Sequence, residues 1–315
     1  MVSFIVRRGM GMLISTFLVI SITFAFMQMI PGDPADVLLG PNATPEQIAS
    51  LRATWGLDQS IWVQYYRYIV NFLHGDLGES LFSRQPVLRM IGQHAETSVF
   101  LGIMALLVVV GLGIPAGVIS SIRPNSWTDN TLLLVALAGA SIPSFWLGLM
   151  LMVVVAGKLH LLPSSGFTSV LATGNIANLK NLILPAISLG FVNAALVART
   201  ARSSMLDVLG ADYITTARAK GLSEWAVIAK HALRNAAIPT VTVISFTFAS
   251  LVSGAVVTEN VFALPGVGSM IVQSVLKRDY PVIQGIMMVV AVLYVVVNFF
   301  TDLTYAMLDP RIRYR

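Results

Sequence analysis

Few side chains in this 315-residue chain could act as catalysts or as metal ligands. The sequence has no cysteine, which excludes disulfides, thiolate metal sites and cysteine nucleophiles. Its one Gly-Lys pair, Gly157-Lys158, is followed by Leu159, so it does not form a phosphate-binding loop. His231 has no second ligand three or four residues away, and no cluster of acids and bases is visible at one depth. We therefore expect no catalytic residue, metal site or cofactor in this chain.

Polar residues within or beside the apolar stretches are the candidates for a transport pathway. Such groups are costly in lipid and normally face a helix bundle or water. Five residues are candidate pathway-lining positions: Ser144, Asn193, Ser250, Ser253 and Glu259. The competing interpretation is a hydrogen bond between helices, above all for the serines. Asp302 lies near the end of the last apolar stretch, and we expect it to pair with Arg311 or Arg313.

The elements that position these residues follow from the apolar composition. Hydrophobic residues make up 56% of the chain and charged residues 11%, whereas soluble domains carry about a quarter charged residues. Six apolar stretches approach or exceed the roughly 20 helical residues that a membrane crossing needs. They cover residues 9–30, 98–122, 131–157, 182–198, 236–257 and 282–304. The predicted fold class is an all-α integral membrane protein with six transmembrane helices.

Proline and glycine residues inside two of these stretches predict local helix geometry. Pro143 should kink the third stretch, because proline removes a helical hydrogen bond. Gly111, Gly113 and Gly117 lie around Pro115 in the second stretch. Small residues at such spacing predict either a close contact with another helix or a hinge.

The basic residues predict the orientation of the chain. Lys and Arg are denser on the side that holds the N-terminus, and the positive-inside rule makes that side cytoplasmic. Both termini are therefore expected in the cytoplasm. The first stretch follows Arg7 and Arg8, and we expect it to remain as a membrane anchor. The net charge of +5 comes from short clusters between apolar runs, so no nucleic-acid partner is expected.

The long segment 31–97 lies on the outer face in this orientation and carries its own helix signals. Thr44-Pro45-Glu46 combines an N-cap, a proline at the first helical position and an acidic first turn. Apolar residues on both sides of Gly56 then predict two short amphipathic helices. Either the membrane surface or the other helices would cover their apolar faces.

The segment 199–235, cytoplasmic in this orientation, has helical patterning on both sides of Gly221. Two sets of residues fall at helical spacing: Tyr213, Ile214 and Ala217 before the glycine, and Trp225, Ile228, Ala229 and Ala232 after it. Ser223 can cap the second helix. The pattern predicts a helix, a glycine turn and a second helix. Such an exposed pair must dock against the protein's own rim or against a peripheral partner.

The run DYITTARAKGL from Asp212 to Leu222, followed by HALRNA from His231, resembles the coupling loop of ATP-binding-cassette (ABC) importer permeases. The chain keeps three residues of the general form of that loop: Ala217, Gly221 and Leu233. Three others differ in the manner of the peptide and nickel branch: Thr215, Thr216 and Arg234.

Further motifs extend the resemblance over nearly the whole chain. They follow the order expected of a B-type subunit: Pro31-Gly32-Asp33-Pro34, Gly56-Leu57-Asp58-Gln59, Gly75-Asp76-Leu77-Gly78, Glu259-Asn260-Val261-Phe262, Pro265-Gly266-Val267-Gly268 and Arg278-Asp279-Tyr280-Pro281. A single motif of this length would be weak evidence, but the ordered set is specific. The chain resembles the B-type subunit of the oligopeptide, dipeptide and nickel permease family, within the binding-protein-dependent (type I) importers.

The resemblance implies that ATPase subunits grip the coupling loop and rock the helices between two states. The residues it assigns to ATPase coupling are Asp212, Tyr213, Thr216, Ala217, Arg218, Ala219, Lys220, Gly221, Leu222, Trp225, His231 and Arg234. The implied partners are a homologous permease subunit in a heterodimer, two ATPase subunits or domains, an extracytoplasmic solute-binding protein, the peptide substrate and membrane lipid. ATP and Mg would bind the ATPase subunits.

The resemblance also implies a division of the chain and a location in the bacterial inner membrane. The regions are an N-terminal anchor helix (1–30), an extracytoplasmic loop (31–97), a transmembrane domain (98–305, coupling loop 199–235) and a cytoplasmic tail (306–315). Dipeptides or short oligopeptides are the expected substrates. Nickel chelates, glutathione or oligosaccharides stay open, because the solute-binding protein largely selects the substrate. An ion-coupled secondary carrier would need inverted repeats and intramembrane carboxylates, and neither is visible.

Overall fold

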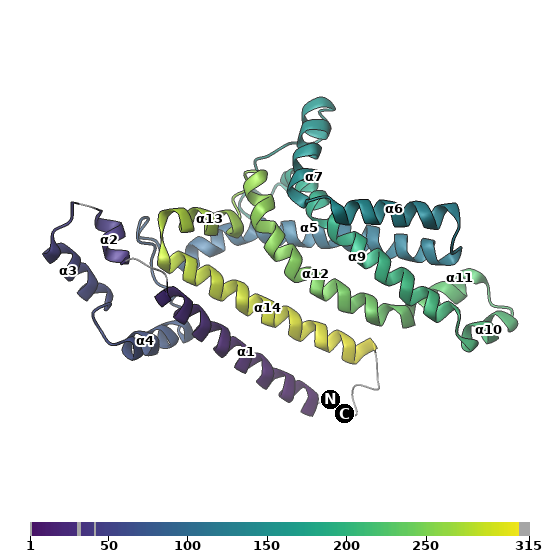
Figure 1. Ribbon diagram of the computed structural model, residues 1–315, viewed down its shortest axis with the longest axis horizontal. Helices are drawn as coiled ribbons and strands as arrows, with labels where there is room; N and C mark the ends of the chain where they lie inside the picture. Colours follow the sequence, from purple (N-terminus) through teal and green to yellow (C-terminus); the bar gives the residue numbers. More distant parts are fainter. Residues whose placement is uncertain (1, 30–32, 41, 309–315) are drawn as a thin grey trace. The chain divides into compact units, whose positions relative to one another are not determined.

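The computed structural model describes residues 2–29, 33–40 and 42–308. Within this range the regular structure is helical, apart from one isolated β-bridge between Glu79 and Pro86. The chain forms two compact units, Met1–Ala95 with Ser269–Phe299 and Glu96–Gly268 with Phe300–Arg315. Figure 1 shows the helices along the chain. The all-α prediction is confirmed. Arg311 and Arg313, the expected partners of Asp302, lie outside the described residues, as do residues 31 and 32 of the first motif.

The first unit contains the helices that the outer segment was expected to form. Its elements are α1 (Val2–Met29), α2 (Pro34–Leu39), α3 (Pro45–Trp55), α4 (Ile61–Leu73), the start of α5 (Val87–Ile122) and most of α13 (Val267–Lys277) and α14 (Tyr280–Leu308). Thr44 caps α3: its hydroxyl accepts from the Gln47 amide at 3.3 Å, and the Gln47 side chain accepts from the Thr44 amide at 3.0 Å. The predicted helix start is confirmed by this reciprocal capping box.

One face of α4 packs on α1, while the opposite face is exposed. The hydroxyls of Ser21 and Tyr65 lie 2.6 Å apart, and the Phe24 ring centroid lies 5.3 Å from the rings of both Tyr65 and Tyr68. Burial raises the pKa of the Tyr68 hydroxyl to about 12, an increase that Gln284 partly offsets. Trp62, on the other face, is 74% exposed. The described helices therefore cover only part of the apolar surface of α4.

The second unit is built around α9 (Ile183–Leu209). Its other elements include the remainder of α5, α6 (Trp127–Ser141), α7 (Ser144–Leu151), η1 (Met152–Lys158), α8 (Val170–Thr173), η2 (Ile176–Leu182) and α12 (Leu233–Val261). α9 packs against α6, α7 and α12. In the most apolar 18 residues of Ile176–Leu209, which joins η2 to α9, 56% of residues are buried, compared with at most 28% in the corresponding stretches of the other four span-length helices. α9 is therefore the core helix of this unit.

Small residues let α5 approach α9 closely. A Cβ on Gly117 would lie 2.5 Å from the Ala198 carbonyl oxygen, and one on Gly113 would lie 2.9 Å from the Val197 side chain. The prediction of a close helix contact is confirmed at these two glycines. At Gly111 no described residue lies within 4 Å of the position that a Cβ would occupy, so this glycine makes no such contact within the described part of the chain.

The described residues contain five helices long and apolar enough to cross a membrane, or six if one bent pair counts as a single span. The bent pair is α6 followed by α7 and η1, with a bend of 101°. The predicted kink at Pro143 is confirmed as a complete break, in which Ile142 adopts an extended conformation that precedes a proline readily. α9 continues to Leu209, beyond the end of the fourth apolar stretch at residue 198.

Candidate functional site

The segment 212–235 forms the predicted helix, glycine turn and second helix. Its elements are α10 (Asp212–Ala219), α11 (Glu224–Ala226), the π-helix η3 (Val227–Ala232) and the start of α12. Gly221 has a φ of +77°, a backbone conformation that disfavours any residue with a side chain. The Ser223 hydroxyl accepts from the Ala226 amide at 3.4 Å and caps α11. The reversal of the chain is therefore encoded by Gly221 followed by Ser223.

A small hydrophobic core fixes this segment to its own unit. The buried members come from α9, α10, η3 and α12: Met205, Ile214, Ala217, Val227, Ile228, Ala232 and Ala236. Val118 of α5 also packs against the cluster. The 212–235 segment is therefore not a loose loop, because burial of this apolar surface favours one position relative to α9 and α12.

The opposite face of the segment presents large apolar side chains to solvent. Trp225 is 76% exposed, Tyr213 is 44% exposed and Leu222 is 41% exposed. The prediction that Trp225 shares a face with Ile228 is wrong, because η3 is a π-helix with i→i+5 bonding and does not keep the α-helical spacing. The exposed face is therefore aromatic and available for docking.

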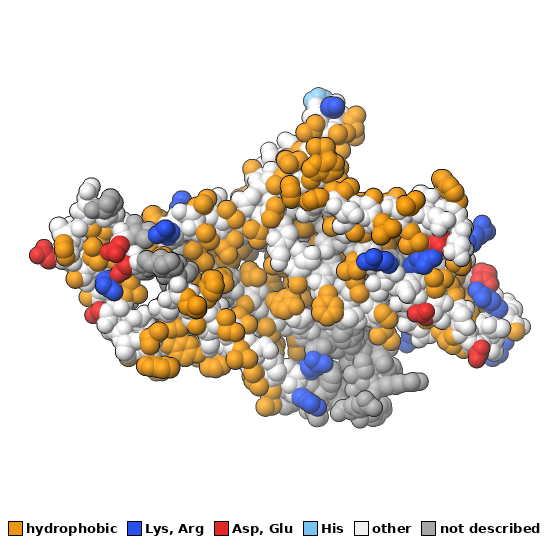
Figure 2. All heavy atoms as spheres, in the orientation of Figure 1, with side chains coloured by type: hydrophobic (Ala, Val, Ile, Leu, Met, Phe, Trp, Pro, Cys, Tyr) orange, Lys and Arg blue, Asp and Glu red, His pale blue; other side chains and the backbone are white. Residues whose placement is uncertain are grey.

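Charged and polar side chains brace the turn from outside. The Arg218 guanidinium donates to both carboxylate oxygens of Glu224, at 2.8 and 3.3 Å. Both side chains are largely exposed, so this ion pair adds little stability. The Asn235 side chain donates to the Tyr213 hydroxyl at 2.8 Å, which ties the end of the segment to α10. Figure 2 shows charged side chains of both signs over α10 and α11.

The remaining candidate coupling residues differ in how far they are exposed. Asp212, Lys220 and Arg234 are exposed, and His231 is half-buried. Thr216 and Ala219 are exposed on α10, and the Thr216 hydroxyl donates to the Asp212 carbonyl at 3.0 Å. Among the described residues, no group of three or more His, Asp or Glu side chains could hold a metal ion.

The five candidate pathway residues have different surroundings. Ser250 and Ser253 are exposed on α12, and Ser144 is half-buried at the start of α7. The half-buried Asn193 donates to the Leu189 carbonyl of its own helix at 2.9 Å. Glu259 is fully buried. A role in the pathway stays a prediction for each of them.

Glu259 has a clear structural position that its sequence context did not reveal. Its carboxylate accepts from the Ser98 hydroxyl at 2.6 Å, and the Ser98 oxygen accepts from the Val267 amide at 2.8 Å. A Cβ on Gly266 would overlap this carboxylate, and one on Gly268 would lie 2.9 Å from it. The Pro265-Gly266-Val267-Gly268 motif therefore turns around the Glu259 side chain. The two glycines were the available signal, because they mark a close approach of the backbone.

A second buried arrangement was also missed. Asp129 of α6 is fully buried and forms an ion pair with Arg202 of α9 at 2.6 Å. In the sequence, Arg202 is one of the Lys and Arg residues on the side of the membrane predicted to be cytoplasmic. No spacing in the sequence connects two residues on separate helices.

Two family models match the chain. The model described as binding-protein-dependent transport system membrane component, N-terminal, matches residues 1–103. The model described as binding-protein-dependent transport system inner membrane component matches residues 113–314. The second match covers α6 to α14 and therefore includes the whole 212–235 segment.

Full-length relatives and one solved structure agree with this match. The chain is 41% identical to the dipeptide transport system permease protein DppB of Escherichia coli K12, over 100% of both chains. It is 40% identical to the protein of the same name from Alkalihalophilus pseudofirmus, over 93% of this chain and 94% of that protein. A chain of the inward-facing MetNI methionine ABC transporter aligns with a TM-score of 0.58 and 17% identity, over 70% of this chain and 97% of that one. That structural likeness concerns the fold.

Proposed function

Because the chain belongs to the family of binding-protein-dependent transport system inner membrane components, we propose that it forms half of a translocation pathway for dipeptides or short oligopeptides. As the membrane permease subunit of an ABC importer it is not catalytic, and a separate subunit hydrolyses ATP. The chain is a multi-pass inner membrane protein. On the basis of its Lys and Arg distribution, both termini and the 212–235 segment lie in the cytoplasm.

One observation carries the proposal: the 212–235 segment has a buried inner face and an exposed aromatic outer face. Ile214 and Val227 are fully buried, whereas Trp225 is 76% exposed. A surface helix pair needs this division if it is to receive a force from a docked partner and pass it to the spans. The inner face supplies a rigid attachment, and the outer face supplies the aromatic anchor typical of protein interfaces.

The mechanism follows from that division. An ATPase subunit holds the outer face in a surface groove and moves it when two such subunits close on ATP. The buried cluster around Met205 carries this movement into α9 and α12, because a packed core transmits displacement. The spans of this chain and of a homologous permease subunit then change between inward-open and outward-open states. ATP and Mg act on the ATPase subunits.

The substrate class rests on the names of the relatives. DppB from two organisms is named as a dipeptide transport permease, and similar full-length proteins from Brucella melitensis and Brucella abortus are named as putative peptide transport permeases. A solute-binding protein outside the membrane delivers the peptide. Nickel chelates, glutathione and oligosaccharides are the alternatives that the same fold would carry.

Uptake into proteoliposomes tests this function. The chain is reconstituted with its homologous permease and ATPase subunits, and a labelled dipeptide is offered with the solute-binding protein outside and ATP inside. We expect uptake that requires ATP and the binding protein and that excess unlabelled dipeptide abolishes. If a nickel chelate or glutathione competes with the labelled dipeptide and unlabelled dipeptide does not, that compound would replace dipeptides as the proposed substrate. Uptake driven by a proton gradient without ATP would contradict the importer.

A further inference from the structure

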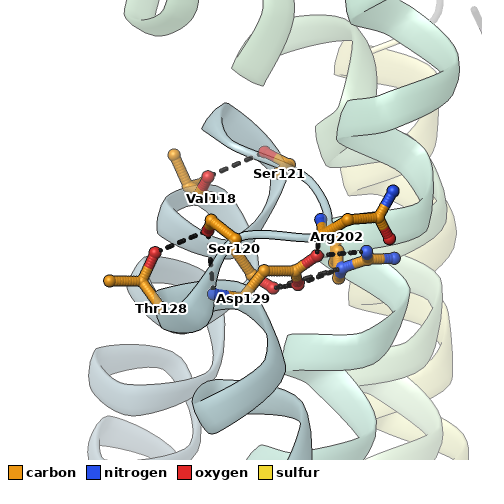
Figure 3. Close-up of polar contacts among 8 residues, drawn as sticks. Val118, Ser120, Ser121, Thr128, Asp129 and Arg202 are labelled. Atoms are coloured by element: carbon orange, nitrogen blue, oxygen red, sulfur yellow. Dashed lines mark hydrogen bonds and ion pairs between the residues drawn. The ribbon is translucent and has the colours of Figure 1, made fainter.

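Asp129 and Arg202 form a buried ion pair that joins three helices of the second unit (Figure 3). The Arg202 guanidinium donates from Nε to Oδ1 of Asp129 at 2.7 Å and from Nη2 to Oδ2 at 2.6 Å. Ser120 of α5 donates its hydroxyl to Oδ1, and the Asn125 amide donates to Oδ2 at 2.8 Å. The carboxylate of Asp129 therefore accepts four hydrogen bonds, which is about the full capacity of its two oxygens.

The ion pair also fixes the turn between α5 and α6. The Ser126 hydroxyl accepts from the Asp129 amide at 3.3 Å and caps α6. The preceding residue, Asn125, has a φ of +61° and directs its amide at the same carboxylate. Asp129 thus bonds to the last turn of α5 and to the connecting turn, and Arg202 of α9 donates to Asp129 and, at 3.2 Å, to the Ser120 hydroxyl oxygen.

The ion pair lies at the base of the 212–235 segment. Arg202 precedes Met205 by one helical turn on α9, and Met205 is fully buried in the cluster that holds Ile214 and Val227. On the other side of the contact, Ser120 precedes Ile122, where α5 ends, and Val118 of α5 packs against the same cluster. Arg202 therefore lies between the buried cluster and the middle of α9.

We infer that Asp129 and Arg202 are positioning residues for the proposed transport cycle: together they make the α5–α6 turn move with α9 when the 212–235 segment is displaced. The inference rests on the proposed function. Gly113 and Gly117 already pack α5 against α9, so the ion pair is not required to bring those two helices together. What it adds is a direct attachment of the first turn of α6, the helix that leads to the break at Pro143.

The chemistry of the pair suits a rigid attachment. A bidentate guanidinium–carboxylate pair fixes orientation as well as distance, and lysine cannot reproduce its two parallel bonds. Asp129 is fully buried whereas the Arg202 side chain is 20% exposed, so removing the Arg202 charge would leave a buried carboxylate without its partner. The attachment therefore fixes both the distance and the orientation of the first turn of α6 relative to α9.

Spin-label distances test the attachment in the intact complex. Because the chain has no cysteine, Cys residues at the exposed positions Trp127 and Thr215 can be labelled specifically within this chain. We expect a narrow distance distribution in the native background and a clearly broader one with Asp129→Asn. In the same proteoliposomes, ATP hydrolysed per peptide imported should rise by about threefold or more in the Asp129→Asn variant.

Matched variants separate the pair from general effects of charge. Asp207→Asn and Arg199→Lys change exposed residues of α9 and should leave both readouts native. Arg202→Lys keeps the charge, and we expect it to broaden the distribution less than Asp129→Asn does. If Asp129→Asn does not assemble with its partners, the distance distribution and the ATP-to-peptide ratio of Arg202→Lys test the inference instead. A native distribution, or a native ratio of ATP to peptide, would overturn the inference. Absence of ATP-driven import in the native complex would instead contradict the proposed function.

Discussion

The 212–235 segment and the helices α3 and α4 of the first unit are both short helical segments with amphipathic sequences, yet they are attached in different ways. The 212–235 segment buries Ile214, Val227 and Ala232 completely. Neither α3 nor α4 has a single buried residue, and α4 touches α1 through Ser21 and Phe24. Amphipathic patterning thus identifies a helix that must dock, but burial in the folded chain shows which segment can transmit force.

The largest contrast is expected from proline at two glycines with the same backbone conformation. Gly221 and Gly75 have φ values of +77° and +76°, and each amide donates to a carbonyl at 2.9 Å. Proline is incompatible with this conformation and removes the donor. We expect Gly221→Pro to abolish ATP hydrolysis by the co-purified complex, and Gly75→Pro to leave it largely intact.

ATP hydrolysis that survives Gly221→Pro would mean that the 212–235 segment does not couple the ATPase subunits to the membrane helices. Recovery of the partner subunits with each variant provides the control, because it separates lost assembly from lost coupling. An equal loss of ATP hydrolysis in Gly221→Pro and Gly75→Pro would show that the glycine turn of the 212–235 segment is no more important for coupling than the turn at Gly75.

The next contrast concerns stability. Ile214 is fully buried in the cluster, so Ile214→Ala should cost about 2–5 kcal/mol through lost burial and the cavity that remains. Trp62 of α4 is 74% exposed, and Trp62→Ala should change stability by at most about 0.5 kcal/mol. Thermal unfolding of the two variants in one detergent measures the difference. A lower unfolding temperature for Trp62→Ala than for Ile214→Ala would show that α4 is the better attached of the two segments.

A third contrast separates docking from folding. Trp225→Ala removes the most exposed aromatic of the 212–235 segment, and we expect about a tenfold loss of peptide-stimulated ATP hydrolysis with an unchanged unfolding temperature. Trp127→Ala, at an equally exposed tryptophan of the same unit, should leave hydrolysis native. Equal effects of the two substitutions would contradict a specific role for Trp225.

The smallest effect belongs to Tyr68 in the first unit. Burial raises its pKa from 10.0 to about 12, so the folded chain holds this proton more tightly than the unfolded chain. The associated stability is constant below pH 10 and is lost as the pH rises from 10 to about 12. The free energy of unfolding, measured from pH 10 to about 12, should fall less steeply with pH for Tyr68→Phe than for the native chain. Identical slopes would show that Tyr68 is not the titrating group.

Local signals in the sequence predicted the outlines of both segments. Thr44 with Pro45 gave the start of α3, and Gly221 with Ser223 gave the turn of the 212–235 segment. These features depend on contacts within a few residues, which a sequence displays directly. The break at Pro143 belongs to the same class, although its angle of 101° was beyond prediction because the packing of α7 on α9 and α12 also determines it.

Contacts between distant residues could not be predicted. Asp129 and Arg202 are far apart in the chain, and so are Ser98 and Glu259. Their pairing depends on how α5, α6, α9 and α12 pack, and helical periodicity contains no information about that. The prediction that Trp225 shares a face with Ile228 failed for a related reason. In the π-helix η3 the wider hydrogen-bonding pattern changes which side chains share a face.

Site-specific photo-crosslinking tests the central claim most directly. A photoreactive amino acid is placed at Trp225 or at Trp62 in the otherwise native complex, and the crosslinked partner is identified by mass spectrometry. We predict that position 225 crosslinks to an ATPase subunit and that position 62 does not. Failure of position 225 to reach an ATPase subunit in an assembled, hydrolysing complex would contradict the assignment of the 212–235 segment as the coupling site.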